Sequence, residues 1–309
     1  MSGSFKYAIG IDIGGTKIAI GLVNAEGCLV ASSSLPTESR KGLSQAVHRI
    51  DAHIKTLLSA HGLTRTDIKG VGVGCPGPLD LKTGVVHNPY TLPGWEGESL
   101  VDHLQSVLGI QVILENDADV ALLGECWKGA GSGMDPVVML TFGTGVGGSV
   151  LARGQIYRGM GGEHPEIGLI PVLPDMPADY SGVQGSLESL ASGSGIAKQG
   201  KVHGLHDAES VFNASKEGHS GASKIVDNAL RGVGIAGWTL AHTFFPECII
   251  LGGGLMDHHF QAYSNSIRSH LKRATLLREQ TIIVSQAKLG NEAGMVGAAG
   301  LWLKYTSMR

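Results

Sequence analysis

Several features that would place a protein in a specialised class are scarce in this sequence. Charged residues make up 17% of the 309 residues, and the formal net charge of -3 gives no electrostatic reason to expect a nucleic-acid partner. The cysteines show no CxxC spacing that would indicate a disulfide framework or a thiolate metal site, and they are only four: Cys28, Cys75, Cys126 and Cys248. We expect a reduced, intracellular chain.

Signals for export and for membrane insertion are lacking as well. The first residues, MSGSFKYAIG, contain neither a basic region nor an apolar signal core, and the most apolar late stretch, 232–246, is too short for a membrane span and is interrupted by glycine. We therefore expect a soluble cytoplasmic protein with no membrane partner. The chain is long enough to bury a sizeable core, so its fold needs neither a disulfide nor a metal.

Glycine, in contrast, is abundant, with 47 residues in 309. This is roughly twice ordinary usage. The glycines gather at the ends of apolar runs, which indicates backbone that comes close to a ligand. The sharpest case is IGIDIGGTKIAIGLVN (9–24), where an acid, two glycines, a hydroxyl and a lysine interrupt an apolar run that then resumes.

Apolar runs of two kinds alternate along the chain. Short β-branched runs bounded by glycine predict strands at 7–13, 18–23, 27–31, 68–74, 111–117, 137–142, 247–253 and 281–287, and a further strand that begins with SVLARG. Helical spacing or composition predicts helices at 43–58, 117–129, 221–245, 257–273 and 291–304. The alternation predicts an α/β protein of two lobes, the first formed by residues 1–115 and 293–309 and the second by residues 116–292.

The order of strand, glycine turn and strand occurs twice. The second copy is VVMLTF followed by GTGVGG (143–148) and SVLARG, and we interpret the pair as a distant internal duplication with one hairpin in each lobe; two unrelated hairpins are the alternative. GTGVGG is not a dinucleotide fingerprint, because a strand and not a helix follows it. GIAKQGKV (195–202) is not a P-loop, because Val202 stands where Ser or Thr is required.

A glycine turn of this kind is suited to phosphate. Its N–H groups form a concavity without side chains, and Thr16 and Lys17 add a hydroxyl donor and a positive charge. Asp12 would hold Mg²⁺ through water, because that ion keeps several waters and prefers one or two carboxylates. We therefore predict that Gly14, Gly15, Thr16 and Lys17 bind the terminal phosphates of a nucleotide, with Gly143, Thr144 and Gly145 binding from the other lobe. A tight hairpin with a chance Asp and Lys is the alternative.

Six motifs in order resemble the ROK family (repressors, open reading frames, kinases) over essentially the whole chain. They are DIGGTK (12–17), ENDAD (115–119), GTGVGG (143–148), PEIG (165–168), SLESLASG (186–193) and ILGGGL (250–255). The resemblance implies a two-lobed actin-like, ribonuclease-H-like ATPase fold with a cleft between the lobes, ATP and Mg²⁺ as cofactors, sugar kinase activity and a homodimer or homotetramer. The family's repressors carry an additional N-terminal DNA-binding domain, for which we expect no room before residue 12.

The resemblance implies roles for individual residues. Asp117 would be the base that takes a proton from the sugar hydroxyl, and its position after a predicted buried strand suits a carboxylate that must be held in place; a plain helix-start acid is the alternative. Asn116 is expected to bind a sugar hydroxyl. Further sugar-binding residues implied by the resemblance are Gly77, Asn88, Glu166 and Glu188, and Gly253 and Gly254 should face the adenosine. A turn residue for Asn88, a helix-surface acid for Glu188 and packing glycines are the alternatives.

The sequence departs from the family at its zinc site. Leu169 stands where the family has a histidine, and no cysteine occurs between 169 and 188, where the family has CxCGxxGC. Tetrahedral zinc needs about four N or S ligands, so we expect no structural zinc. Packing must then order the loop that carries Glu188, with Pro171, Pro174, Pro177 and Tyr180 as candidates. His164 is a candidate for the missing sugar contact, and a surface histidine is the alternative.

These observations predict an ATP-dependent hexose kinase that acts on the sugar 6-hydroxyl. Glucose is the leading acceptor, fructose is close behind because HPEIG (164–168) resembles the fructokinase branch, and N-acetylmannosamine or N-acetylglucosamine is a further alternative. A sugar-binding regulator without kinase activity is the contrasting hypothesis, and the retained Asp12, Lys17 and Asp117 argue against it. A nucleotide-driven assembly protein of the actin class is the third, for which ENDAD and PEIG would have no purpose.

Overall fold

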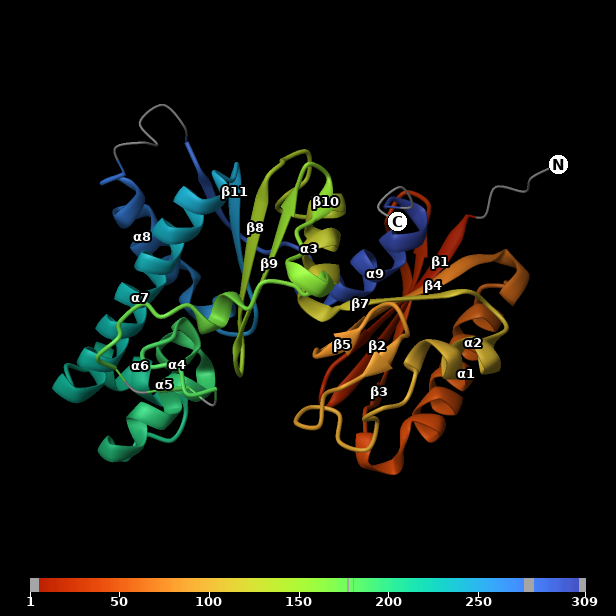
Figure 1. The fold of residues 1–309 in the computed structure, drawn as a ribbon, viewed down its shortest axis with the longest axis horizontal. Helices are drawn as coiled ribbons and strands as arrows, with labels where there is room; N and C mark the ends of the chain where they lie inside the picture. Colours follow the sequence, from red (N-terminus) through yellow and green to blue (C-terminus); the bar gives the residue numbers. More distant parts are fainter. Residues whose placement is uncertain (1–5, 177, 180, 275–280, 306–309) are drawn as a thin grey trace. The chain divides into compact units, whose positions relative to one another are not determined.

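The chain folds into two units, each built around a five-stranded sheet (Figure 1). The computed structural model describes residues 6–176, 178–179, 181–274 and 281–305. Unit 1 comprises Met1–Gly133, Met160–His164 and Lys288–Arg309, and unit 2 comprises Met134–Gly159 and Pro165–Ala287. The boundary thus lies after Gly133, later than the expected boundary after residue 115, because the helix that follows Asn116 packs within unit 1.

The sheet of unit 1 has the order β3-β2-β1-β4-β7. β1 pairs antiparallel with β2 and parallel with β4, so the chain forms a hairpin first and then adds parallel strands. β1, β2 and β4 are buried almost throughout, as expected for strands with both faces covered, whereas the edge strand β3 is exposed at every second residue. The bounds are β1 Tyr7–Ile13, β2 Lys17–Asn24, β3 Leu29–Pro36, β4 Ile68–Cys75 and β7 Val112–Asn116, with a separate pair β5 Leu79–Asp80 and β6 Val85–Val86.

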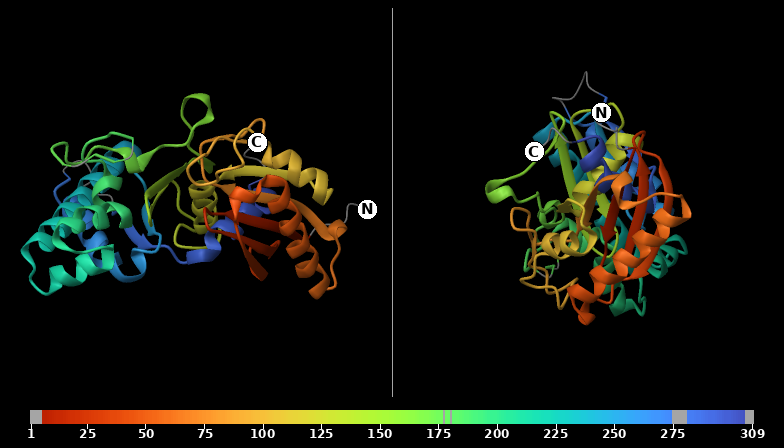
Figure 2. Two further views of the ribbon diagram at one scale, coloured as in Figure 1. Left: turned by 90° about the horizontal axis from the view of Figure 1, so that it is seen from below. Right: turned by 90° about the vertical axis from the view of Figure 1, so that its right-hand side faces the viewer.

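Helices cover the two faces of this sheet in different ways. α1 (Leu43–Ala60) and α2 (Leu100–Leu108) lie side by side and bury leucine, isoleucine and valine against one face (Figures 1 and 2). On the other face, α9 (Ala293–Leu303) approaches Gly10 and Gly72 so closely that a Cβ on either glycine would overlap a carbonyl oxygen of the helix. Part of the glycine excess therefore serves helix packing and not ligand binding.

The sheet of unit 2 repeats the same order, β10-β9-β8-β11-β12, with the same pattern of three antiparallel strands and two parallel additions. This is the arrangement that the predicted duplication requires. Its strands are β8 Val137–Phe142, β9 Val146–Ala152, β10 Gln155–Ile156, β11 Cys248–Gly252 and β12 Ile283–Gln286. Its helices are α4 Leu187–Ala191, α5 Gly193–Gly200, α6 Ala208–Lys216, α7 Ser220–Phe244 and α8 Met256–Leu271.

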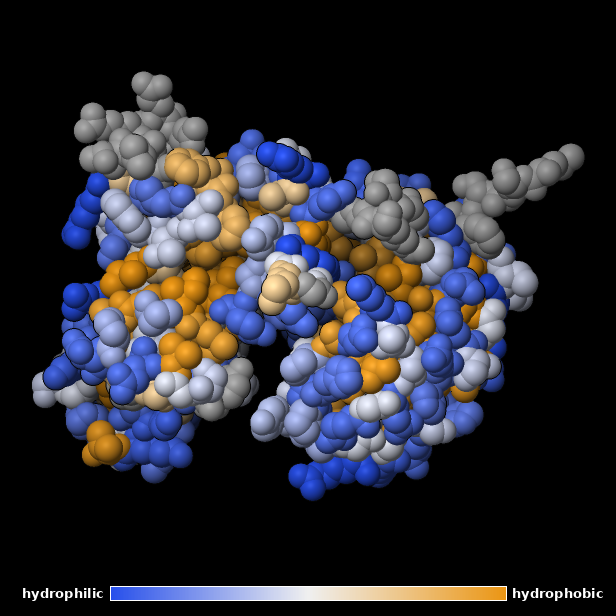
Figure 3. All heavy atoms as spheres, viewed as in Figure 1, coloured by the Kyte–Doolittle hydropathy of each residue, from blue (hydrophilic) through white to orange (hydrophobic). Residues whose placement is uncertain are grey.

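Most elements expected from the apolar pattern are confirmed. The third strand runs over Leu29–Pro36 instead of 27–31. The elements that the pattern did not predict are the helices α2, α4, α5 and α6 and the short strands β5, β6 and β10. On the face shown in Figure 3, hydrophilic and apolar residues are interspersed, and exposed large apolar side chains include Tyr90, Met160 and Val202. Within the described ranges, none of the helices combines the length and apolar character needed to span a membrane.

Candidate functional site

In unit 1, polar residues meet where neighbouring parallel strands end. Asp12 near the end of β1 lies opposite Gly74 on β4, and Cys75 at the end of β4 lies opposite Asn116 at the end of β7. The next residue, Asp117, is the first of α3 (Asp117–Lys128). Because these strands run in the same direction, their carboxyl ends share one edge of the sheet, which is where open α/β sheets bind ligands.

The start of α3 is held in place by Asn116. The Asn116 side-chain oxygen accepts hydrogen bonds from the N–H groups of Ala118 (2.9 Å) and Asp119 (3.4 Å), which makes it the N-cap of the helix. Its Nδ2 lies 3.4 Å from Nε2 of His164. Asn116 thus fixes the position of Asp117 and approaches His164, the residue considered above as a substitute for the missing histidine.

Burial and charge perturb the acidic groups at this edge. Burial, and then the charge of Asp117, raise the pKa of Asp12 to about 6, against the opposing effect of Lys17. Burial also raises the pKa of Asp117, although the N–H of Ala118 and the nearby His164 act in the opposite direction. A carboxylate with a raised pKa is a better proton acceptor near neutral pH than an ordinary one. The pair of acids also makes the edge attractive to a cation.

The glycine turn of unit 1 is closed by its own backbone and braced by a threonine. The N–H of Gly14 donates to the carbonyl of Lys17 (2.9 Å). Thr37, which is fully buried, donates its hydroxyl to the carbonyl of Gly14 (2.6 Å) and its N–H to the carbonyl of Thr16 (3.0 Å). The side chains of Thr16 and Lys17 are exposed. Sequence reasoning missed Thr37, because nothing in the sequence connects it with a turn that lies twenty residues earlier.

Gly77 and Asn88 are brought together beside Asn116. Nδ2 of buried Asn88 donates to the carbonyl of Gly77 (2.6 Å), and its Oδ1 accepts from the N–H groups of Thr91 (2.8 Å) and Tyr90 (3.1 Å). A Cβ on Gly77 would lie 3.6 Å from Nδ2 of Asn116. The amide of Asn88 therefore orders this loop, and the bare backbone of Gly77 lies next to the start of α3.

In unit 2, the glycine turn rests on the first residues of α5. The carbonyl of Gly143 accepts from the N–H of Gly193 (2.8 Å), and the carbonyl of Thr144 accepts from the N–H (3.1 Å) and the hydroxyl (2.6 Å) of Ser194. The turn is thus held through its carbonyl oxygens by a helix that is distant in sequence.

Glu188, on α4, lies against the same turn. Its Oε2 accepts from the N–H of Val146 (2.8 Å), and a Cβ on Gly145 would lie only 2.5 Å from that oxygen. Burial raises the pKa of Glu188, and so do the charges of Asp179 and Glu166, against the opposing hydrogen bond from Val146. The side chain of Glu166 is exposed at the start of a 3-10 turn over Ile167–Leu169. The negative charge of Glu166 thus acts on the carboxyl group of Glu188 within unit 2.

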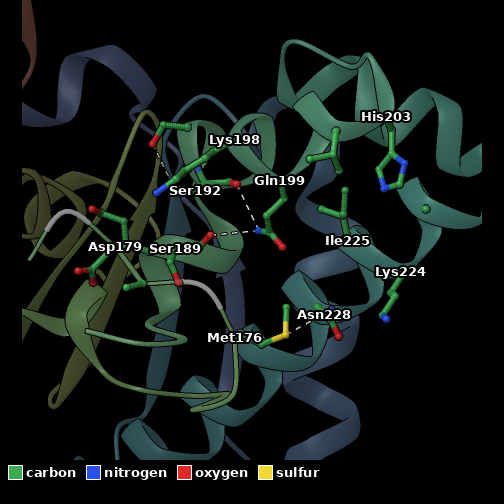
Figure 4. Close-up of a pocket in the computed structure, with 16 residues that line it drawn as sticks. Met176, Asp179, Ser189, Ser192, Lys198, Gln199, His203, Lys224, Ile225 and Asn228 are labelled. Atoms are coloured by element: carbon green, nitrogen blue, oxygen red, sulfur yellow. Dashed lines mark hydrogen bonds between the residues drawn. The ribbon is translucent and has the colours of Figure 1, made fainter. Parts of the chain in front are cut away.

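A pocket of about 720 Å³ opens beside Glu188 within unit 2 (Figure 4). Gln199 bridges its wall by donating to the carbonyls of Ser189 (3.1 Å) and Gly195 (3.2 Å). Its volume is in the range usual for small-molecule sites. Sequence reasoning did not predict this pocket, whose charged and polar lining comes mainly from α5 and α7 and includes Asp179, Ser192, Ser194, Lys198, His203, Lys224 and Asn228.

The two glycines after β11 have different surroundings. Gly253 has a φ of 88°, and a Cβ there would overlap the carbonyl of Phe142, so this position requires glycine for close packing. A Cβ on Gly254 would meet nothing within 4 Å. Of the pair assigned to the adenosine, Gly254 is thus the residue with open space beside it.

Backbone hydrogen bonds order part of the segment that replaces the family's zinc loop. The N–H of Val172 donates to the carbonyl of Gly185 (2.9 Å), and that of Leu187 donates to the carbonyl of Ile170 (2.9 Å). Pro171 forms an isolated bridge with Ser186, whereas Pro177 and Tyr180 lie outside the described residues. In the described parts of the chain, no group of three or more His, Cys, Asp or Glu could hold a metal ion. The expected lack of structural zinc stays a prediction.

Two sheets of the same order, each with a glycine turn at its hairpin, define the class of two-lobed actin-like α/β proteins. The chain belongs to the ROK family, whose family model matches residues 8–305.

Individual relatives agree. A glucokinase of Halalkalibacterium halodurans is 34% identical over 97% of this chain and 95% of its own length. A ROK hexokinase from Thermus thermophilus has a solved structure with a TM-score of 0.86 and 30% identity, covering 97% of this chain and 98% of that one. A ROK family glucokinase from Streptomyces griseus, solved in complex with glucose and AMPPNP, has a TM-score of 0.75 and 30% identity, covering 96% and 99%.

Proposed function

We propose that this protein is an ATP-dependent hexose kinase that transfers the γ-phosphoryl group of ATP to the 6-hydroxyl of a sugar, with glucose as the leading acceptor. The similarity to a glucokinase over nearly the whole chain supports the reaction class. The similarity to a structure in complex with glucose and AMPPNP supports both substrates.

The observation that carries the proposal is the start of α3. Asp117 is fixed by the Asn116 cap at a sheet edge, and burial raises its pKa. In the proposed reaction the Asp117 carboxylate takes the proton of the sugar 6-hydroxyl while that oxygen attacks the γ-phosphorus, and the bond from phosphorus to the leaving ADP oxygen breaks. A positioned base of this kind contributes on the order of 10²–10⁴ in rate.

The residues of unit 1 fit a magnesium ion. Asp12 is a half-buried carboxylate whose pKa is raised by burial and then by the charge of a second carboxylate, Asp117, and a divalent cation relieves such a concentration of negative charge. We assign Asp12 to holding Mg²⁺ through water. When bound, Mg²⁺ would neutralise charge on the phosphates.

Backbone donors and glycines are assigned to the nucleotide. We assign the turn Gly14–Lys17 of unit 1, and Gly143, Thr144 and Gly145 of unit 2, to the phosphates. The bracing of both turns by hydroxyl donors supports this, because a preorganised set of N–H groups loses little entropy when it binds an anion. Gly253 and Gly254 are assigned to the adenosine side.

The remaining assignments concern the sugar. Asn116 and Asp117 of unit 1 and Glu166 and Glu188 of unit 2 are assigned to hydroxyl groups, because carboxylates and amides accept hydrogen bonds from them. Gly77 and Asn88 are assigned to the same side, with Asn88 acting through the loop that its amide orders.

An assay of ADP release across a panel of sugars tests the proposal. Glucose, fructose, N-acetylmannosamine and N-acetylglucosamine are the acceptors to compare. ADP release that depends on one of these sugars is the expected result. Sugar-independent ATP hydrolysis would instead indicate an assembly protein, and sugar binding without turnover would indicate a regulator.

Location and assembly complete the proposal. Because ATP is the phosphoryl donor, we assign the protein to the cytoplasm, where ATP is available. We propose a homodimer or homotetramer, which light scattering coupled to size-exclusion chromatography would measure; a monomeric mass would contradict this assignment.

A further inference from the structure

Glu125 is a buried carboxylate for which the proposed chemistry gives no role. It lies in the last turn of α3, with 0% of its surface exposed. Its two oxygens accept three backbone hydrogen bonds, from the N–H groups of Ala130 (2.7 Å), Lys288 (3.1 Å) and Leu289 (2.7 Å). Buried carboxylates of this kind are held by charge-assisted hydrogen bonds, which are stronger than those between neutral groups.

The partners of Glu125 lie on two of the connections between the units. The first connection follows α3 and enters unit 2 after Gly133, and the second leaves unit 2 after Ala287. Ala130 is on the first connection and Lys288 begins the second, so one side chain binds both connections where they meet unit 1. The chain also crosses between the units on either side of Met160–His164.

Both connections are anchored again on the unit 2 side. The N–H of Ala287 donates to the carbonyl of Leu251 (2.9 Å), directly before Lys288, which is bound to Glu125. On the first connection the N–H of Asp135 donates to Glu247 (3.3 Å). The stretch between the anchors is therefore short, and in the first connection it includes Gly133, whose φ of 78° suits glycine.

Backbone packs closely around the side chain of Glu125. A Cβ on Gly129 would overlap its Oε2, and the Glu125 carbonyl accepts from the N–H groups of Gly129 and Gly131 (3.0 Å each). One residue earlier, Gly124 lies so close to α9 that a Cβ would overlap the carbonyl of Ala293. The end of α3 thus packs on the start of α9, and Glu125 binds the segment just before α9.

We propose that Glu125 is a positioning residue that fixes the two connections, and through them the geometry in which unit 1 and unit 2 act together in phosphoryl transfer. This rests on the proposed function, in which Asp117 of unit 1 and Glu188 of unit 2 serve one reaction. A misplacement of about 1 Å caused far from the chemistry can cost 10²-fold in rate. Two connections that are held by one buried side chain are a place where such a misplacement would arise.

The test compares Glu125→Gln with a matched control. Glutamine has the same shape but turns an NH₂ group toward N–H donors, so at least one of the three bonds is lost. Asp51→Asn is the control, because Asp51 is also a buried acid of unit 1. Asp51 forms ion pairs with Lys55 on α1 and with Arg65 in the segment after α1. Hydrogen exchange of individual amides and steady-state kinetics are measured on both variants.

We expect the amides of Ala130, Lys288 and Leu289 to exchange at least about 10-fold faster in Glu125→Gln, and kcat to fall about 10- to 100-fold. Asp51→Asn should change neither quantity, even where its melting temperature falls as much. Unchanged exchange at the three amides, faster exchange with wild-type kcat, or an equal loss of kcat in Asp51→Asn would each overturn the proposal.

Two further outcomes are distinguishable. If the wild-type protein turns over none of the sugars, the proposed function fails and the kinetic role of Glu125 fails with it, while exchange still shows whether the side chain holds the connections. If Glu125→Gln does not fold, Glu125→Asp keeps the charge but shortens its reach, and the same pattern is expected with a smaller loss of kcat; wild-type kcat in that variant, together with faster exchange, would overturn the proposal.

Discussion

Units 1 and 2 share a sheet of the same order and differ in what stands at the ends of its strands. In both, a three-residue glycine turn follows the first strand of the sheet. In both, a hydroxyl braces a carbonyl of that turn at 2.6 Å, from Thr37 to Gly14 and from Ser194 to Thr144. The braces come from unrelated elements, a strand end in one unit and a helix start in the other.

The side chains at equivalent positions have different chemistry. On β1, Asp12 lies opposite Gly74 of β4, and on β8 the matching residue is Thr141, opposite Gly252 of β11. Unit 2 instead brings its carboxylate to the turn from a helix, with Glu188. The comparison teaches that the repeated backbone supplies two similar turns, whereas the proposed proton transfer is assigned to one acid of unit 1, Asp117.

Of the substitutions considered, Asp117→Asn should lower the activity most. We expect kcat to fall by about 10²–10⁴-fold, because the amide cannot accept the proton of the sugar hydroxyl. The melting temperature should not fall, since burial disfavours the charge of Asp117 and its removal relieves that cost. A variant with more than a tenth of wild-type kcat would remove Asp117 from the proposed reaction.

Glu188→Ala tests the turn of unit 2. The substitution removes the acceptor for the N–H of Val146 and the proposed contact with the sugar. A hydrogen bond to a charged group contributes about 1.5–3 kcal/mol, so kcat/KM for the sugar should fall about 10- to 100-fold. Glu188→Gln is the control, because it keeps an acceptor for the N–H of Val146 but removes the negative charge. It therefore separates the effect of supporting the turn from the effect of the charge. Equal, wild-type kinetics in both variants would exclude Glu188 from sugar binding.

The pH dependence of kcat/KM should reveal the raised pKa of Asp117 in unit 1. The Asp117 base must be ionised, and burial raises its pKa above the ordinary value of 3.8, so activity should be lost as the pH falls through a range above that of an exposed aspartate. The contribution of Asp117 to the free energy of unfolding should rise as the pH falls through this range. The reason is that a raised pKa lets the folded state bind more protons than the unfolded state. An acid limb near the ordinary value would mean that Asp117 is not perturbed in the active enzyme.

The hydroxyl groups of Thr37 and Ser194 should contribute unequally to the free energy of unfolding. Thr37 is fully buried and Ser194 is exposed, so Thr37→Val should lower the free energy of unfolding by about 1–2 kcal/mol and Ser194→Ala by less. Both should raise KM for ATP a few fold, because each loosens a turn assigned to phosphate. Denaturant unfolding and initial rates measure the two effects, and a change of KM confined to the sugar would contradict the assignment of the turns.

Removal of metal should have the smallest effect. If the segment around Leu169 holds no zinc, treatment of the purified protein with a chelator, followed by excess Mg²⁺, should leave both the melting temperature and kcat unchanged. Metal analysis of the untreated protein is the direct measurement, and one equivalent of tightly bound zinc would show that the expectation from the sequence is wrong.

Much of the fold follows from the sequence because its strands are short, β-branched and bounded by glycine. The helices it does not predict include α2, whose nine residues were too short a periodic run to stand out, and α4, which has five. The expected lobe boundary after residue 115 lies earlier than that of the structure, which assigns α3 to unit 1 because Gly297 and Gly124 let it pack on α9.

The sequence predicted that Asp12 and Asp117 follow buried strands, and the structure places both at the same edge of the sheet. The candidate site was not predictable where a side chain acts on the backbone of a distant segment. Thr37 and Glu125 bind backbone carbonyl and N–H groups, which nearly every residue type possesses, so no pattern of residue types marks them. The dual use of Asn116, as helix cap and as a neighbour of His164, likewise depends on the folded chain.

The glycine-lined face of the first sheet affects the order in which the protein can be assembled during translation. Gly10 and Gly72 are synthesised early, yet the helix that covers them, α9, is synthesised only after unit 2. Since domains form as units while the chain grows, unit 1 waits with this part of its sheet uncovered until unit 2 has been made. Its maturation is thus tied to the synthesis of unit 2.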